Sequence, residues 1–167
     1  MMQKKVCMLG GFAVGKTSLV RRFVTSLFSE QYHTTIGVSV EKKALSVDGE
    51  DVTLMLWDLY GDDEFQRIRE SYLRGSSGYI LVVDGTRKET LATALTLQQT
   101  VEGLLGPIPF AVIVNKSDVR AEWEVDDAAL DELRQRGWSL FLGSAKTGDG
   151  VEPLFLTLAD RMLRQAV

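Results

Sequence analysis

The sequence predicts an α/β fold in which helices cover both faces of a mostly parallel, six-stranded sheet. Short apolar segments recur along the chain, and each ends in a polar or glycine-containing turn. Segments with helical spacing lie between most of them, an alternation typical of parallel sheets. The chain has 167 residues, 45% of them apolar, which suits one domain with one core. We therefore expect residues 1–167 to form a single domain.

The strands can be placed in order along the chain. Residues 38–57 contain two strand-like runs on either side of Asp48-Gly49, a dipeptide typical of tight hairpins. This hairpin predicts one antiparallel strand at the edge of the sheet. Ligands of such sheets bind beyond the carboxyl ends of the strands, so the turns after them are candidate sites. The buried strands are expected at 5–10, 52–58, 79–85, 110–116 and 139–144.

Helices are expected between these strands. Residues 17–24 follow a glycine-rich loop, and two later segments repeat apolar side chains at helical spacing. Each repeat predicts a helix with one face packed on the sheet. The residues that mark these faces are Leu91, Ala94, Leu95, Gln98 and Val101 in the first segment, and Val151, Phe155, Leu158 and Met162 in the second.

Composition and terminal sequences favour a cytoplasmic protein with no encoded membrane anchor. The net charge of -4 gives no support for a nucleic acid or an anionic membrane as partner. The longest apolar runs, 79–83 and 110–114, are far shorter than the ~20 residues of a membrane span. Neither end carries a signal peptide or a lipidation motif. Cys7, in the first strand, is interpreted as a small buried hydrophobe rather than a reactive thiol.

The segment "GGFAVGKT" fits the pattern G-x-x-x-x-G-K-[ST] and stands between a predicted strand and a predicted helix. Its backbone N–H groups can surround a phosphate, Lys16 can reach the β and γ phosphates, and the Thr17 hydroxyl can bind Mg²⁺. The motif predicts a P-loop NTPase fold. The expected phosphate contacts come from Gly10, Gly11, Phe12, Ala13, Val14, Gly15, Lys16, Thr17 and Ser18.

The segment "NKSD", at the end of the strand 110–116, predicts recognition of guanine. An ionised Asp118 accepts two hydrogen bonds from guanine, whereas adenine offers no such pair of donors. Lys116 can lay its aliphatic stem on the base, and Asn115 can tie neighbouring loops together. After the last strand, Ser144, Ala145 and Lys146 form a further base-binding candidate, with the Ala145 N–H directed at the guanine O6.

Three residues are candidates for sensing the nucleotide state. Asp58, in "DLYG", can hold Mg²⁺ through a water, and the Gly61 N–H can meet a γ-phosphate. Thr35 can be a second hydroxyl ligand to Mg²⁺ that engages only when that phosphate is present.

With these motifs in place, the chain resembles the Ras-superfamily small GTPases, and the Rab branch most closely. The segments "TTIGVSV", "EFQRIRESYLRGS" and "LVVDGT" carry the resemblance, which covers essentially the whole chain. It implies a switch between GTP and GDP states that acts through effector, exchange and activating proteins. It also implies that Phe28 packs on the guanine and that Val40, Trp57 and Tyr72 form an apolar effector surface. Core packing is the alternative role for those three.

The chain departs from this family at Asp62, where a glutamine normally orients the attacking water. A glutamine amide both donates and accepts, whereas an ionised aspartate only accepts, and Asp63 and Glu64 add negative charge beside it. Phe12 stands where the family often has a small residue, and Leu59-Tyr60 replace a Thr-Ala pair. We therefore expect slow intrinsic hydrolysis.

Lys16, Thr35, Gly61 and Asp62 are the catalytic candidates for this reaction. One alternative is a nucleotide-dependent interaction module without turnover, and another is an efficient enzyme that uses Asp62 or His33 as base. A small-molecule kinase would leave "NKSD" and "SAK" unused. Trp123 and Trp138 are interpreted as packing residues.

Overall fold

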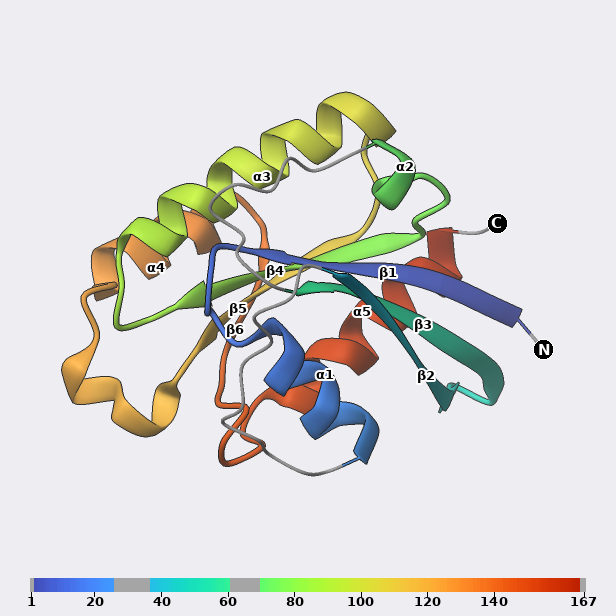
Figure 1. The fold of residues 1–167 in the computed structure, drawn as a ribbon, viewed down its shortest axis with the longest axis horizontal. Coiled ribbons are helices and arrows are strands. Elements are labelled where there is room, and N and C mark those ends of the chain that lie inside the picture. The colour runs from blue at the N-terminus through green and yellow to red at the C-terminus, as the bar shows by residue number, and fades with distance from the viewer. Residues whose placement is uncertain (1, 26–36, 61–69, 166–167) are drawn as a thin grey trace.

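The computed structural model describes residues 2–25, 37–60 and 70–165, and these residues form a six-stranded sheet between two layers of helices (Figure 1). The strands lie side by side in the order β2-β3-β1-β4-β5-β6. All neighbours are parallel except β2 and β3, which confirms the predicted α/β fold with one antiparallel edge strand. The strands are β1 (Met2–Gly10), β2 (Gly37–Val47), β3 (Glu50–Tyr60), β4 (Gly78–Asp84), β5 (Phe110–Asn115) and β6 (Ser139–Leu142).

The antiparallel pair is a tight hairpin. Val47 pairs with Glu50, so only two residues form the turn. Both have positive φ, 51° at Asp48 and 81° at Gly49, as a type I′ turn requires. This geometry matches the twist of the two strands and explains why Asp48-Gly49 predicted the hairpin.

Helices cover both faces of the sheet (Figure 1). One face packs on α1 (Lys16–Thr25) and α5 (Val151–Gln165). The other packs on α2 (Glu70–Leu73), α3 (Glu89–Leu105) and α4 (Asp127–Gln135), and a short 3-10 helix, η2 (Ser117–Glu122), follows β5.

The core follows the alternation of side chains along each strand. In β1, Val6 and Met8 join the cluster that includes α1 and α5, whereas Cys7 and Leu9 join the cluster on the opposite face. Cys7 is fully buried, and burial raises the pKa of its thiol. These facts fit its interpretation as a small hydrophobe.

The parallel strands β1, β4, β5 and β6 end at the same edge of the sheet, because they run in one direction. Segments that are far apart in the sequence therefore meet there. None of the helices in the described part of the chain is long and apolar enough to span a membrane.

Candidate functional site

The glycine-rich segment runs from the end of β1 into the first turn of α1 and closes on itself. Ala13 and Gly15 have positive φ, 59° and 103°, which turn successive backbone groups toward one another. A side chain at Gly15 would overlap the Asn115 amide. Lys16 is only 7% exposed, and its Nζ donates to the Gly10 carbonyl at 3.4 Å. The lysine ammonium is thus held within the loop.

Asn115 joins the glycine-rich segment to the segment after β6. Its Nδ2 donates to the Val14 carbonyl at 3.0 Å, and its Oδ1 accepts from the Ala145 N–H at 3.1 Å. The side chain is 3% exposed, so both hydrogen bonds are shielded from water. From the sequence we expected the Ala145 N–H to meet the guanine O6. In the structure this N–H donates to Asn115 Oδ1 instead.

Asp118 is exposed, and Ser144 fixes its orientation. The Ser144 hydroxyl donates to Asp118 Oδ1 at 2.7 Å. The Ser144 hydroxyl oxygen in turn accepts from the N–H groups of Lys146 and Thr147 at 3.1 and 3.2 Å. From α1, Arg22 Nε donates to the Ala145 carbonyl at 2.9 Å, a contact that the sequence motifs did not reveal. The glycine-rich segment, α1 and the segments 115–118 and 144–147 are therefore linked to one another at this edge.

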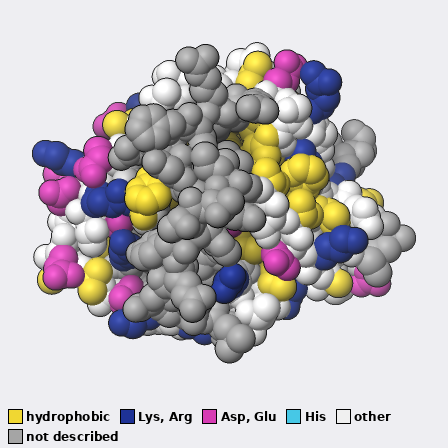
Figure 2. Space-filling model, in the orientation of Figure 1, with side chains coloured by type: hydrophobic (Ala, Val, Ile, Leu, Met, Phe, Trp, Pro, Cys, Tyr) yellow, Lys and Arg dark blue, Asp and Glu magenta, His cyan; other side chains and the backbone are white. Residues whose placement is uncertain are grey.

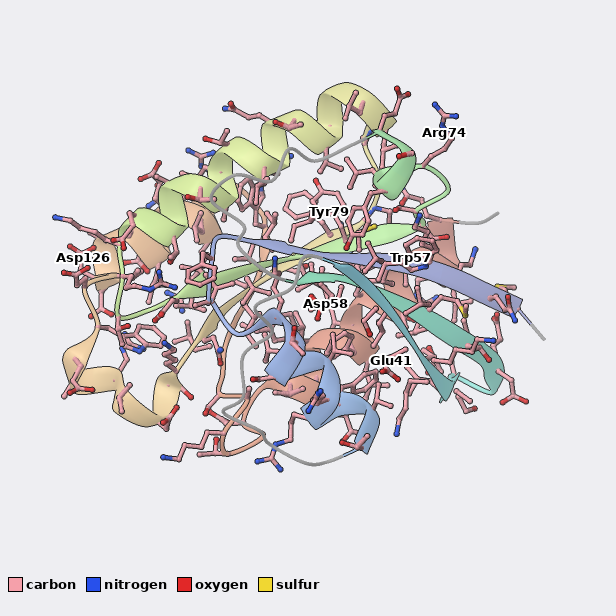
Figure 3. All side chains as sticks on the ribbon, in the orientation of Figure 1. Glu41, Trp57, Asp58, Arg74, Tyr79 and Asp126 are labelled. Atoms are coloured by element: carbon pink, nitrogen blue, oxygen red, sulfur yellow. The ribbon has the colours of Figure 1, made fainter. Side chains whose placement is uncertain are left out.

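Thr17 and Asp58 bring a hydroxyl and a carboxylate together. Thr17 lies in the first turn of α1, and its Oγ1 donates to Asp58 Oδ2 on β3 at 2.5 Å. Asp58 is 1% exposed, and Figure 3 shows its side chain on the face of β3 opposite Trp57. Mg²⁺ prefers such hard oxygen ligands, so this donor set fits a magnesium ion.

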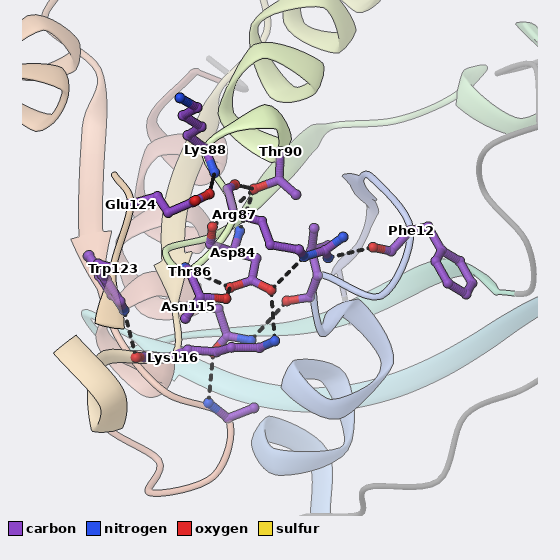
Figure 4. Close-up of polar contacts among 12 residues, drawn as sticks. Phe12, Asp84, Thr86, Arg87, Lys88, Thr90, Asn115, Lys116, Trp123 and Glu124 are labelled. Atoms are coloured by element: carbon purple, nitrogen blue, oxygen red, sulfur yellow. Dashed lines mark hydrogen bonds and ion pairs between the residues drawn. The ribbon is translucent and has the colours of Figure 1, made fainter. Parts of the chain in front are cut away.

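A buried carboxylate that sequence reasoning missed lies at the end of β4. Asp84 is fully buried, and its Oδ2 accepts from Lys116 Nζ at 2.7 Å and from Arg87 Nε at 3.0 Å (Figure 4). Its Oδ1 accepts from the N–H and the hydroxyl of Thr86 at 2.9 and 2.7 Å. Arg87 also donates to the Phe12 carbonyl at 2.6 Å. Asp84 thus links the predicted guanine-binding segment to the predicted phosphate loop.

The hydrogen bonds to Asp84 keep it ionised. Burial by itself raises the pKa of this carboxyl, but the hydrogen bonds from Lys116, Thr86 and Arg87 together lower the pKa below its usual value. Asp84 therefore carries a negative charge at neutral pH, which offsets the charges of the two cations beside it. The only sequence signal for this role was the position of an aspartate at a strand end.

The remaining predicted residues fall into two groups. Phe12, within the loop, is 42% exposed, whereas Gly11 of the loop and Ser18 of α1 are half-buried. The other predicted site residues, Phe28, Thr35, Gly61 and Asp62, lie outside the described residues, as does His33.

The three residues of the predicted effector surface lie together but differ in exposure. Val40 of β2 pairs with Trp57 of β3 and is 41% exposed, and Trp57 is half-buried. Tyr72 is only 8% exposed; its hydroxyl donates to the Trp57 carbonyl at 2.7 Å, so it supports Trp57 more than it forms surface. Lys5 Nζ lies 3.7 Å from the centre of the Trp57 ring. Figure 2 shows hydrophobic side chains gathered in this region of the surface.

The order of the strands and the glycine-rich loop between β1 and α1 show that this protein has a Ras-like P-loop GTPase fold. The Ras family model matches residues 5–164, and the chain belongs to this family.

Its relatives lie near the Rab branch. Ras-related protein Rab-30 of Homo sapiens is 35% identical over 164 residues, which cover 97% of this chain and 81% of the relative. Ras-related protein Rab-4 of Dictyostelium discoideum is 34% identical over 154 residues, covering 91% and 75%. Ras-related protein SEC4 of Saccharomyces cerevisiae is 33% identical over 156 residues, covering 93% and 73%. The chain is thus a GTP-binding switch of the small GTPase class.

Proposed function

We propose that this chain is a Mg²⁺-dependent switch between GTP and GDP whose intrinsic hydrolysis is slow. The observation that carries the site assignment is the pair of buried hydrogen bonds of Asn115. One amide fixes the loop that would hold phosphate relative to the segment that would hold guanine. A nucleotide with both parts spans these two segments.

Asp118 is the residue proposed to select the base. Ser144 occupies only its Oδ1, and the side chain is otherwise exposed at the edge of the sheet. An ionised carboxylate there accepts from the N1–H and the amine of guanine. Lys116 contributes its stem, while Phe28 packs on the base. The Ala145 N–H would have to serve both Asn115 and the guanine O6.

The phosphates are assigned to the glycine-rich loop, to Lys16 and to a magnesium ion. Thr17, Thr35 and, through a water, Asp58 would hold the ion, which neutralises charge on the phosphate oxygens. Lys16 is already directed into the loop by its contact with Gly10, so little reorganisation is needed for it to meet an anion. Thr35 and the Gly61 N–H are assigned to the γ-phosphate, the group that distinguishes the two states.

Slow hydrolysis follows from the chemistry of residue 62. Phosphoryl transfer in this class depends on positioning and electrostatics. A carboxylate at position 62 accepts a proton from water but donates nothing to the phosphate, and its charge opposes the anion. Phe12 is exposed on the outside of the loop, where it would also hinder an arginine supplied by an activating protein.

The second candidate function is an interaction module that binds nucleotide without turnover. The exposed Val38 and Val40 beside Trp57 favour a protein partner for either candidate. We propose that effectors bind this surface, and that exchange and activating proteins act through the same region.

Two measurements test the proposal. Competition titrations with Mg²⁺ should show GTP and GDP bound far more tightly than ATP; equal affinity for ATP would contradict the assignment of Asp118. Single-turnover phosphate release from GTP-loaded protein should be slow but measurable. No release over many hours from protein that retains intact GTP would favour the module without turnover.

A further inference from the structure

We propose that Trp123 is a positioning residue that sets how fast guanine nucleotide leaves this protein. The inference rests on the proposed nucleotide site and adds a residue to it. Trp123 follows η2, is half-buried, and belongs to none of the motifs that predicted the site.

The indole holds the backbone of Lys116 in a conformation that needs support. Lys116 has φ 77° and ψ 37°, a left-handed conformation that residues other than glycine adopt only where the surroundings hold them. Trp123 Nε1 donates to the Lys116 carbonyl at 2.8 Å (Figure 4), and the Val119 N–H donates to the same oxygen at 3.0 Å. The tryptophan therefore adds a side-chain hydrogen bond to the backbone hydrogen bond that the local turn already provides.

The indole also packs directly on the end of β4. A side chain at Gly85 would overlap the indole ring, so the ring lies against the Gly85 backbone. The Gly85 carbonyl accepts from the N–H groups of Glu124 and Val125 at 2.9 and 3.1 Å, which fixes the segment that carries Trp123. On the ring itself, the Arg120 guanidinium lies 4.4 Å from the ring centre.

Lys116 is consequently held at both ends. Trp123 binds its carbonyl, and Asp84, the residue before Gly85, binds its ammonium at 2.7 Å. The segment 115–118 carries the proposed guanine contacts, so loss of the indole contact should loosen the base. Lys16 and Thr17 belong to the phosphate side of the site, so the rate of hydrolysis of bound GTP should not change.

Trp138 provides a matched control within the same chain. It is also half-buried, it has the Arg136 guanidinium 5.3 Å from its ring centre, and it packs edge-on against Phe110. It precedes β6 at the amino ends of the strands, opposite the proposed nucleotide edge. Trp138→Phe therefore reports any general effect of losing a half-buried indole.

The test measures release of GDP carrying a fluorescent ribose label after addition of excess unlabelled GDP. Trp123→Phe keeps an aromatic ring but removes the donor. We expect release to become about three- to tenfold faster, the range that the loss of one hydrogen bond gives. Association and single-turnover hydrolysis should stay unchanged, and Trp138→Phe should release at the wild-type rate.

Gly85→Ala tests the same contact from its other side, because the added methyl group must displace the indole. It should also speed release, and the double variant should release no faster than the faster single variant. Wild-type release from Trp123→Phe, equal acceleration by Trp138→Phe, or multiplicative effects in the double variant would overturn the proposal. Failure of the wild-type protein to retain labelled GDP would instead contradict the proposed nucleotide site.

Discussion

Asp84→Asn should destabilise the protein strongly, because it removes a buried charge while keeping the shape of the side chain. Asparagine can keep the contacts of Oδ1 with Thr86, but its Nδ2 would meet the donors of Lys116 and Arg87. Removing one partner of a buried ion pair costs about 3–5 kcal/mol. Since the two cations are 38% and 34% exposed, water recovers part of this cost, and we expect a loss of about 2–3 kcal/mol.

The assay is urea unfolding at neutral pH with a fixed excess of GDP and Mg²⁺, since bound ligand shifts apparent stability. Asp127→Asn is the control, because it breaks the exposed ion pair between Arg120 and Asp127, which are 43% and 86% exposed. That variant should change the free energy of unfolding by less than about 1 kcal/mol. Equal effects of the two substitutions would refute the role assigned to Asp84.

The difference between wild type and Asp84→Asn should depend on pH in one direction. The pKa of Asp84 is lowered in the folded state, so its stabilising contribution is complete above the pKa that it has in the unfolded chain. The contribution is lost as the pH falls through the lowered, folded-state value. The difference should therefore be constant near neutrality and shrink below about pH 4. If the difference in unfolding free energy between wild type and Asp84→Asn grew on acidification, the pKa of Asp84 would not be lowered in the folded state.

Three further predictions concern the nucleotide. Asp118→Asn should weaken GTP binding and increase binding of xanthosine nucleotide, whose C2 carbonyl suits an amide donor; unchanged GTP affinity in a competition titration would speak against the base assignment. Lys16→Ala should weaken GTP and GDP alike by removing a charge-assisted contact, as measured by calorimetry, and a normal affinity for both would be inconsistent with it. Thr17→Asn should impair the Mg²⁺-dependent GTP state most, and an unaltered magnesium titration would rule out Thr17 as a ligand.

The fold was predictable because its signals are local. The apolar runs, the Asp48-Gly49 turn and the helical repeats each occupy a short window, and the structure confirms the sheet that they imply. The helix α4 was not predicted, although Asp126 caps it by accepting from the Ala129 N–H at 2.9 Å. Its buried face shows only Leu130 and Leu133, too short a repeat to stand out.

The site was predictable only in part, because motifs name residues but not the contacts that position them. Arg87 and Phe12 are 75 positions apart in the chain, and Lys116 and Asp84 are 32 apart, so no pattern in the sequence joins them. Trp123 was interpreted as packing because its partner is a backbone carbonyl, which every residue possesses. Hydrogen bonds between residues far apart in the chain can be identified only from the structure, in which the carboxyl ends of the strands meet at one edge of the sheet.

We propose that hydrolysis by this small GTPase is slow because of the residue at position 62, which lies outside the described residues. Single-turnover phosphate release from GTP-loaded wild type and Asp62→Gln tests it most directly. Glutamine restores a group that donates and accepts and removes one negative charge beside the phosphate, so the rate should rise while nucleotide affinity changes little. A lower rate in Asp62→Gln, with a wild-type pH profile that follows a carboxylate, would show instead that Asp62 acts as a general base.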